Sequence, residues 1–107
     1  MREPIVEICC GSFYDALQAA EGGAKRIELN SALMLGGLTP STATLKLVKQ
    51  NIPDLKVITM VRPRGAGFCY SKEEFRVMEA ECLELLEAGA DGIAFGCLKA
   101  DGNLDVV

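Results

Sequence analysis

The chain has 107 residues, which is enough for one domain with one hydrophobic core. Half of the residues are hydrophobic, and the net charge is −4 without a basic cluster, so we expect no nucleic-acid partner. There is no histidine, which excludes His-based catalytic triads, HExxH sites and His-containing zinc sites within this chain.

The sequence also bears on location and thiol state. An apolar segment begins at residue 5 without a charged, secretion-type leader before it, and no apolar run approaches the ~20 residues of a membrane-spanning helix. We therefore expect a cytoplasmic protein with no membrane partner. Five cysteines without a CxxC pair, in an odd number, predict free thiols rather than a disulfide framework.

The first quarter of the chain predicts a strand, a helix and a second strand. The strand spans residues 5–9, and Ser12 with Asp15 three residues later has the spacing of a helix-starting capping box. A tight turn over residues 22–25 then leads directly into a strand over residues 26–30.

The same alternation continues through two further helices. Thr39 before a proline predicts a second helix start, and residues 56–62 form the third strand. Ser71 with Glu74 predicts the third helix start, and residues 92–97 form the fourth strand. The apolar stripe of the third helix consists of Phe75, Met78, Cys82 and Leu85.

Four strands alternating with three helices indicate an α/β fold built from parallel βαβ units. Residues 16–29 align with residues 82–95 at an offset of 66, which favours a repeating architecture. The long loops after residues 30 and 62 are typical of α/β barrels, which keep their sites on that face. A doubly wound open sheet is the alternative fold, but neither its GxGxxG fingerprint nor a phosphate-binding GxxxxGK[ST] loop occurs, so we expect no nucleotide cofactor.

Strand alternation brings candidate site residues to one side of the sheet. Glu7 and Cys9 share one side of the first strand, and Glu28 and Asn30 share one side of the second. Because the apolar neighbours should meet the helices, these four side chains are expected to point toward a barrel axis. Glu7 and Glu28 are therefore the candidate catalytic acid and base, and Asn30 is a candidate ligand-binding residue.

Two arginines are expected at the same mouth. Arg62 ends the third strand, and Arg64 returns a second guanidinium two residues later. Both are candidates to bind an anionic group, whereas the equal alternative is a buried ion-pair network with the carboxylates. Phe68 and Tyr70 follow in the same loop, either as an aromatic lid or as packing for the mouth.

Cys9 is the candidate metal ligand. It lies at the carboxyl end of the first strand, where a nearby arginine would lower the pKa of its thiol, and soft thiolates select Cu(I) or zinc. The alternative is that Cys9 is a small buried hydrophobic residue, the usual state of a free cysteine. Cys10 should face the helices, and Cys69 and Cys97 fall on the loop face, from which they could approach Cys9.

Several stretches together resemble the CutC copper-homeostasis family. The matching stretches are Val6-Glu-Ile-Cys9, Gly22-Gly-Ala-Lys-Arg-Ile-Glu-Leu29, Gly36-Gly-Leu-Thr-Pro-Ser41, Arg62-Pro-Arg-Gly65 with Phe68 and Tyr70-Ser71, and Ala90-Asp-Gly92 with Asp101-Gly102. The resemblance implies a TIM (βα)8 barrel, a cytosolic homo-oligomer and a role in handling Cu(I). It implies no established enzymatic reaction.

Two departures from the family pattern modify what the resemblance implies. Residues 1–107 form a single domain equivalent to the N-terminal half of the barrel, and we expect a truncated product, or a chain that buries its open strand edges by dimerising. Many relatives have cysteine in place of Asn30. With asparagine there, a two-thiolate Cu(I) site through that pair is not available.

Three hypotheses follow. The leading one is a CutC-like barrel in copper homeostasis, with Cys9 as the Cu(I) ligand. The alternative is an enzyme acting on a small anionic metabolite through Glu7, Glu28, Arg62 and Arg64. The third is a half-barrel without activity of its own.

Overall fold

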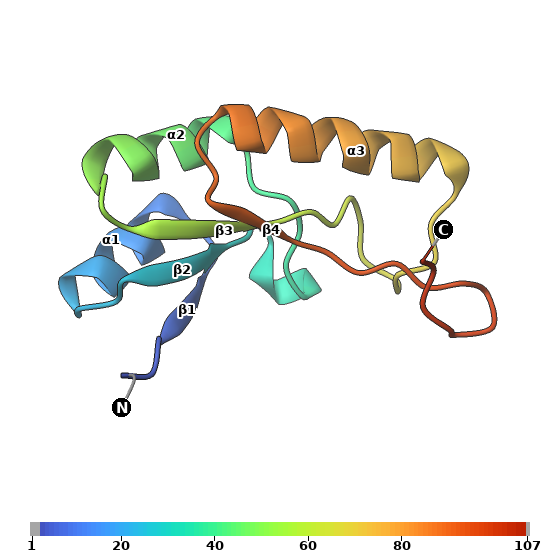
Figure 1. Ribbon diagram of the computed structural model, residues 1–107, viewed down its shortest axis with the longest axis horizontal. Helices are drawn as coiled ribbons and strands as arrows, with labels where there is room; N and C mark the ends of the chain where they lie inside the picture. Colours follow the sequence, from blue (N-terminus) through green and yellow to red (C-terminus); the bar gives the residue numbers. More distant parts are fainter. Residues whose placement is uncertain (1–2, 107) are drawn as a thin grey trace.

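A computed structural model describes residues 3–106 as one parallel sheet with a helical layer. Four strands, three α-helices and one 3-10 turn alternate along the chain (Figure 1). In chain order they are β1 (Glu7–Cys10), α1 (Phe13–Glu21), β2 (Arg26–Leu29), η1 (Leu33–Leu35), α2 (Thr42–Asn51), β3 (Lys56–Met60), α3 (Lys72–Glu87) and β4 (Gly92–Ala94).

The order of the strands confirms the barrel-type α/β fold. All three strand pairs are parallel, and the strands lie side by side in chain order, β1-β2-β3-β4. The three α-helices lie on one side of the sheet, and the η1 turn lies on the other (Figure 1). A doubly wound sheet would reverse its strand order and place helices on both faces, so this arrangement excludes it.

The strands are shorter or shifted relative to the sequence prediction. β1 runs from Glu7 to Cys10 rather than over residues 5–9, because its pairing with β2 begins at Glu7 and Arg26. β3 ends at Met60 and β4 at Ala94, since the ladder between them covers only residues 58–60 and 92–94. The parity of each strand is as predicted.

Two of the three predicted helix starts are confirmed. Ser12 caps α1 by accepting a hydrogen bond from the Asp15 backbone, and Ser71 and Glu74 form a complete capping box on α3. The third prediction was wrong, because Ser41 and not Thr39 caps α2. The Thr39 hydroxyl is instead engaged by the backbone of Arg62, which donates its N–H over 2.9 Å.

The two copies of the internal repeat end their helices in the same way. Gly23 after α1 and Gly89 after α3 have φ of 99° and 107°, the left-handed conformation that glycine adopts without strain. In each copy the next residue donates its N–H to a carbonyl five residues back, Ala24 to Ala19 and Ala90 to Leu85. This Schellman ending turns the chain sharply into the following strand.

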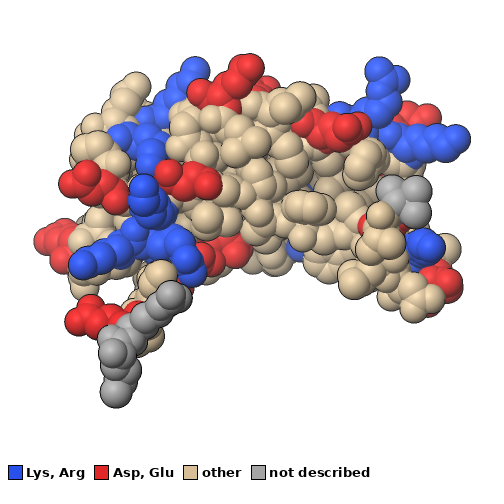
Figure 2. All heavy atoms as spheres, viewed as in Figure 1, with Lys and Arg blue, Asp and Glu red and all other residues tan. Residues whose placement is uncertain are grey.

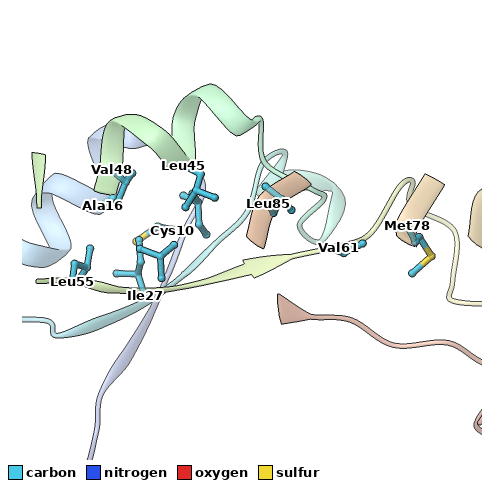
Figure 3. Close-up of a cluster of buried hydrophobic side chains, with 11 residues drawn as sticks. Cys10, Ala16, Ile27, Leu45, Val48, Leu55, Val61, Met78 and Leu85 are labelled. Atoms are coloured by element: carbon cyan, nitrogen blue, oxygen red, sulfur yellow. The ribbon is translucent and has the colours of Figure 1, made fainter. Parts of the chain in front are cut away.

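The hydrophobic core lies between the sheet and the helices (Figure 3). Ile27 from β2 and Leu45 from α2 are completely buried, which stabilises the fold by roughly 1.5–3 kcal/mol for each such side chain. In the predicted stripe of α3, Met78 and Leu85 are buried and Cys82 is half-buried, but Phe75 is 46% exposed. Phe75 instead lines an apolar groove beside β4.

The sheet has two open edges. Within residues 3–106, β1 and β4 each have a single neighbouring strand. A groove with a volume of about 330 Å³ lies between α3 and the end of β4, lined by Val61, Phe75, Met78, Glu79, Cys82, Leu83 and Phe95. Figure 2 shows that uncharged residues cover the middle of one face, whereas charged residues gather toward its ends and along α3.

The exposed surface of the chain is larger than its mass predicts. The accessible area is 7028 Å² and the radius of gyration is 14.4 Å. A compact chain of this mass exposes about 5,800 Å² and has a radius of gyration of about 13 Å. Apolar side chains account for part of the excess, with Val6, Leu83 and Phe95 at least 60% exposed. No helix in the described part of the chain is long and apolar enough to span a membrane.

Candidate functional site

The candidate site lies on the face of the sheet opposite the helices, here named the inner face. Its members on β1 and β2 are Glu7, Cys9, Arg26, Glu28 and Asn30, which follows directly after β2. Their strand neighbours Cys10, Ile27 and Leu29 point the other way and are completely buried under the helices. The pairing register places Cys9 beside Glu28 and Glu7 beside Arg26.

Glu7 forms an ion pair across the first two strands. Its Oε2 atom lies 2.6 Å from Nε of Arg26, although the N–H does not point at this oxygen in hydrogen-bonding geometry. Both side chains are about one-third exposed, so the pair is only partly shielded from water. Arg26 therefore neutralises Glu7, a role that the sequence analysis did not foresee. Arg26 lies two residues before Glu28 in β2 and so shares its side of the strand, and this was the signal from which the sequence could have indicated the role of Arg26.

Asn30 connects the two candidate residues beside it. It is 2% exposed, and its Nδ2 atom lies 3.4 Å from Sγ of Cys9 and 3.2 Å from Oε1 of Glu28. Gly37 packs against the other end of the amide, where an added Cβ atom would collide with Oδ1 of Asn30. The predicted neighbours Cys9, Glu28 and Asn30 are thus brought together, and a glycine fixes the position of the amide.

The electrostatic environment of Cys9 differs from the prediction. Partial burial raises the pKa of the Cys9 thiol, and the carboxylates of Glu28 and Glu7 raise this pKa further. The prediction that a nearby arginine lowers the pKa of the Cys9 thiol is wrong, because burial and then the neighbouring carboxylates determine this pKa. Cys9 therefore exists mainly as the neutral thiol at neutral pH.

The remaining cysteines do not complete a metal site. All five thiols are free. Cys10 is buried in the core as predicted, where burial and Asp15 raise its pKa to about 11. Within residues 3–106, no group of three or more Cys, Asp or Glu side chains is arranged to hold a metal ion. The donors around Cys9 are one thiol, one amide and carboxylates, so they offer Cu(I) a single soft ligand.

Arg62 follows the end of β3 and is held from several sides. Thr39 fixes its backbone, and the guanidinium carbon lies 4.6 Å from the centre of the Phe68 ring. Nη1 donates to the carbonyl of Leu35 in the η1 turn over 3.4 Å. A Cβ atom at Gly36 would lie 2.7 Å from the same Nη1, so glycine there leaves room for the guanidinium.

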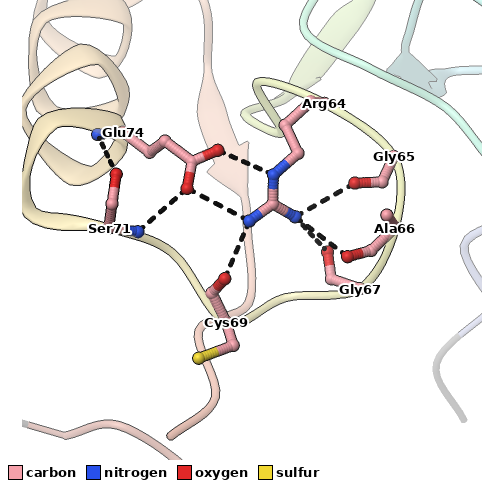
Figure 4. Close-up of polar contacts among 7 residues, drawn as sticks. All are labelled: Arg64, Gly65, Ala66, Gly67, Cys69, Ser71 and Glu74. Atoms are coloured by element: carbon pink, nitrogen blue, oxygen red, sulfur yellow. Dashed lines mark hydrogen bonds and ion pairs between the residues drawn. The ribbon is translucent and has the colours of Figure 1, made fainter. Parts of the chain in front are cut away.

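Arg64, predicted as a second anion-binding group, is occupied by the chain itself (Figure 4). Its Nε and Nη2 atoms form a bidentate pair with Glu74 of α3 at 2.6 and 3.1 Å. Nη2 also donates to the carbonyl of Cys69, and Nη1 donates to three carbonyls of the loop 65–67. Arg64 therefore organises the loop between β3 and α3 and has no donor group left for a ligand.

Glu74 is the counterpart of this arrangement. The hydrogen bond from Arg64 and the backbone N–H of Ser71 lower the pKa of Glu74 from 4.5 to about 2. The same carboxylate thus caps α3 and binds the guanidinium that shapes the preceding loop. The Arg64–Glu74 pair therefore links the start of α3 to the conformation of the loop that contains Phe68 and Tyr70.

Taken together, the inner face offers a thiol, a carboxylate without an ion-pair partner among the described residues, and a guanidinium at the end of β3. Glu28 has no cation within ion-pair distance in residues 3–106, whereas Glu7 has Arg26. Whether either carboxylate acts as a general acid or base stays a prediction. Binding of a ligand through Arg62 and Asn30 also stays a prediction.

Comparisons with known proteins agree on one family. The sequence profile of the CutC family matches residues 4–107. A family protein CutC of Treponema denticola is 54% identical over 105 residues, which are 98% of this chain and 42% of that protein. A copper homeostasis protein cutC homolog of Homo sapiens is 46% identical over 101 residues, which are 94% of this chain and 37% of that protein.

A solved structure supports the same relationship. The crystal structure of CutC from Streptococcus agalactiae superposes with a TM-score of 0.86 at 32% sequence identity. The match covers 92% of this chain and 48% of that one. The chain therefore spans less than half the length of each of these relatives and corresponds to their N-terminal part.

Proposed function

Because the chain belongs to the CutC family, we propose that it acts in copper homeostasis and that Cys9 is the residue through which it binds Cu(I) as cargo. The names of the human and mouse relatives support the general role. The single observation that carries the residue assignment is the position of Cys9. It is an exposed thiol on the inner face, at the carboxyl end of β1, where barrel proteins keep their sites.

The proposed site uses one thiolate from this chain. Cu(I) prefers soft sulfur ligands, and the neighbouring amide and carboxylates are hard donors. Asn30 stands next to the sulfur at 3.4 Å, so a second protein thiolate does not come from that position. In the proposed site the second soft ligand is a thiol from outside the described residues, which would make this a site for receiving and passing on Cu(I).

Binding at Cys9 depends on pH. The thiol pKa is raised by burial and by Glu28 and Glu7, so Cu(I) has to displace a proton at neutral pH. The affinity therefore rises with pH until the thiol pKa is passed. The two carboxylates favour the bound cation once the proton has left.

Anaerobic titration with a chromophoric Cu(I) chelator as competitor, in the presence of an external thiol, tests the proposal. Wild type should bind one Cu(I) that Cys9→Ser loses, whereas Cys69→Ser, at an exposed loop thiol, should retain it. Asn30→Cys should bind more tightly, because it places a second thiolate beside the first. Equal stoichiometry in wild type and Cys9→Ser would remove Cys9 from the site.

A further inference from the structure

The inner face carries a second sulfur-bearing side chain, Met60 at the end of β3. The residues on either side of it, Thr59 and Val61, are at most 1% exposed beneath the helices, so strand alternation places Met60 on the opposite, inner face. Met60 is half-buried there and lies outside the hydrophobic core cluster. Its thioether is a soft donor, and soft donors select Cu(I).

The stagger of the strands brings Met60 level with Cys9. The tilted strands of a (βα)8 barrel are staggered by about one residue per strand, and each inner layer takes its side chains from alternate strands. The contact between Asn30 and Cys9 gives the direction of this stagger, because Asn30 lies two residues beyond Glu28, the register partner of Cys9. Cys9 is thus level with the point midway between these two residues of β2. A second step of one residue, from β2 to β3, ends two residues beyond Ile58, at Met60.

The residues beside Met60 leave room for its side chain to extend over the inner face. On β4 its register partner is Ala94, whose side chain is a single methyl group. On β2 its neighbour is Asn30, one residue after the last register pair of these two strands. Methionine has three rotatable bonds, so its sulfur adapts its position readily. Asn30, whose amide already contacts Cys9, is therefore the only residue of this level between the two sulfur-bearing side chains on the sheet.

We propose that the thioether of Met60 is a third, weaker ligand of the Cu(I) that Cys9 binds. This inference rests on the proposed function and adds a residue to that same site. Cu(I) is then held by the Cys9 thiolate, the Met60 thioether and the external thiol, all of them soft donors. The neutral thioether keeps Cu(I) on the inner face while one external thiol replaces another.

The methyl signals of methionine provide a direct readout. With ¹³C-methyl-labelled methionine under anaerobic conditions, the Met60 methyl signal should shift and saturate at one Cu(I) per chain. Met34 is 93% exposed on η1 and Met78 is buried in the core, so their signals should not change. This titration uses the wild-type chain and does not depend on how a variant folds. A saturable shift of Met34 in place of Met60 would overturn the inference.

Competition with a chromophoric chelator measures the contribution of the thioether. Met60→Leu nearly conserves the volume of the side chain but removes its sulfur, and it should weaken Cu(I) binding by about tenfold or more. Met34→Leu removes an exposed thioether in the same way and should bind Cu(I) as tightly as wild type. Equal weakening by the two changes would contradict a specific role for Met60.

Two outcomes separate this inference from the proposed function. Retained Cu(I) binding in Cys9→Ser would overturn the proposed function and the role of Met60 with it. Loss of binding in Cys9→Ser, together with wild-type affinity in Met60→Leu and an unshifted Met60 methyl signal, would overturn the role of Met60 alone.

Discussion

Replacing Gly37 with alanine tests how the inner face is held in place. Gly37 has φ of 92°, a conformation that costs a residue with a Cβ atom about 1–2 kcal/mol. The added Cβ would also collide with Oδ1 of Asn30, so the buried amide has to move away from Cys9 and Glu28. Losing the partners of a buried polar group adds about 1–3 kcal/mol.

Gly23 is a matched control for the backbone contribution. Its φ of 99° is close to that of Gly37, but a Cβ atom there has nothing within 4 Å. Gly23→Ala should therefore lower the free energy of unfolding by about 1–2 kcal/mol, the backbone cost alone. Gly37→Ala should exceed this by the contribution of the displaced amide.

Urea denaturation followed by circular dichroism measures both variants, with a third comparison in the Asn30→Ala background. Without the amide, the extra cost of Gly37→Ala should disappear and the two glycine changes should become equal. Equal destabilisation by Gly23→Ala and Gly37→Ala in the wild-type background would refute the view that Gly37 fixes Asn30.

Two further predictions concern the Arg64–Glu74 pair and the open strand edges at β1 and β4. The Glu74 pKa lies below its ordinary value of 4.5, so its contribution is complete above about pH 4.5 and is lost as the pH falls toward about 2. The Ser71 amide signal should shift over this range in wild type and stay constant in Glu74→Gln. The 107-residue chain should also associate, because its accessible area exceeds the expected value by about 1,200 Å², more than the ~800 Å² that a partner buries in a standard interface. Light scattering that shows a monomer from micromolar to millimolar concentrations would contradict this expectation.

Local sequence patterns determined the layers of this protein. Alternation along each strand assigned Glu7, Cys9, Glu28 and Asn30 to one face, because successive side chains of a strand point to opposite sides. Capping residues three positions apart located the starts of α1 and α3. These features depend on neighbours within a few residues, so the sequence contains all that is needed to predict them.

The tertiary structure alone decided which charged groups meet. Arg26 pairs with Glu7 because of the register between two strands, and Arg64 turns to Glu74 because its loop folds back onto the start of α3. Thr39 was similarly diverted from capping a helix by the backbone of Arg62, 23 residues away. Electrostatic partners depend on distances across strands and loops, and spacing along the chain does not fix those distances. For that reason the residues of the inner face could be predicted from the sequence, but their ion pairs and the raised pKa of Cys9 could not.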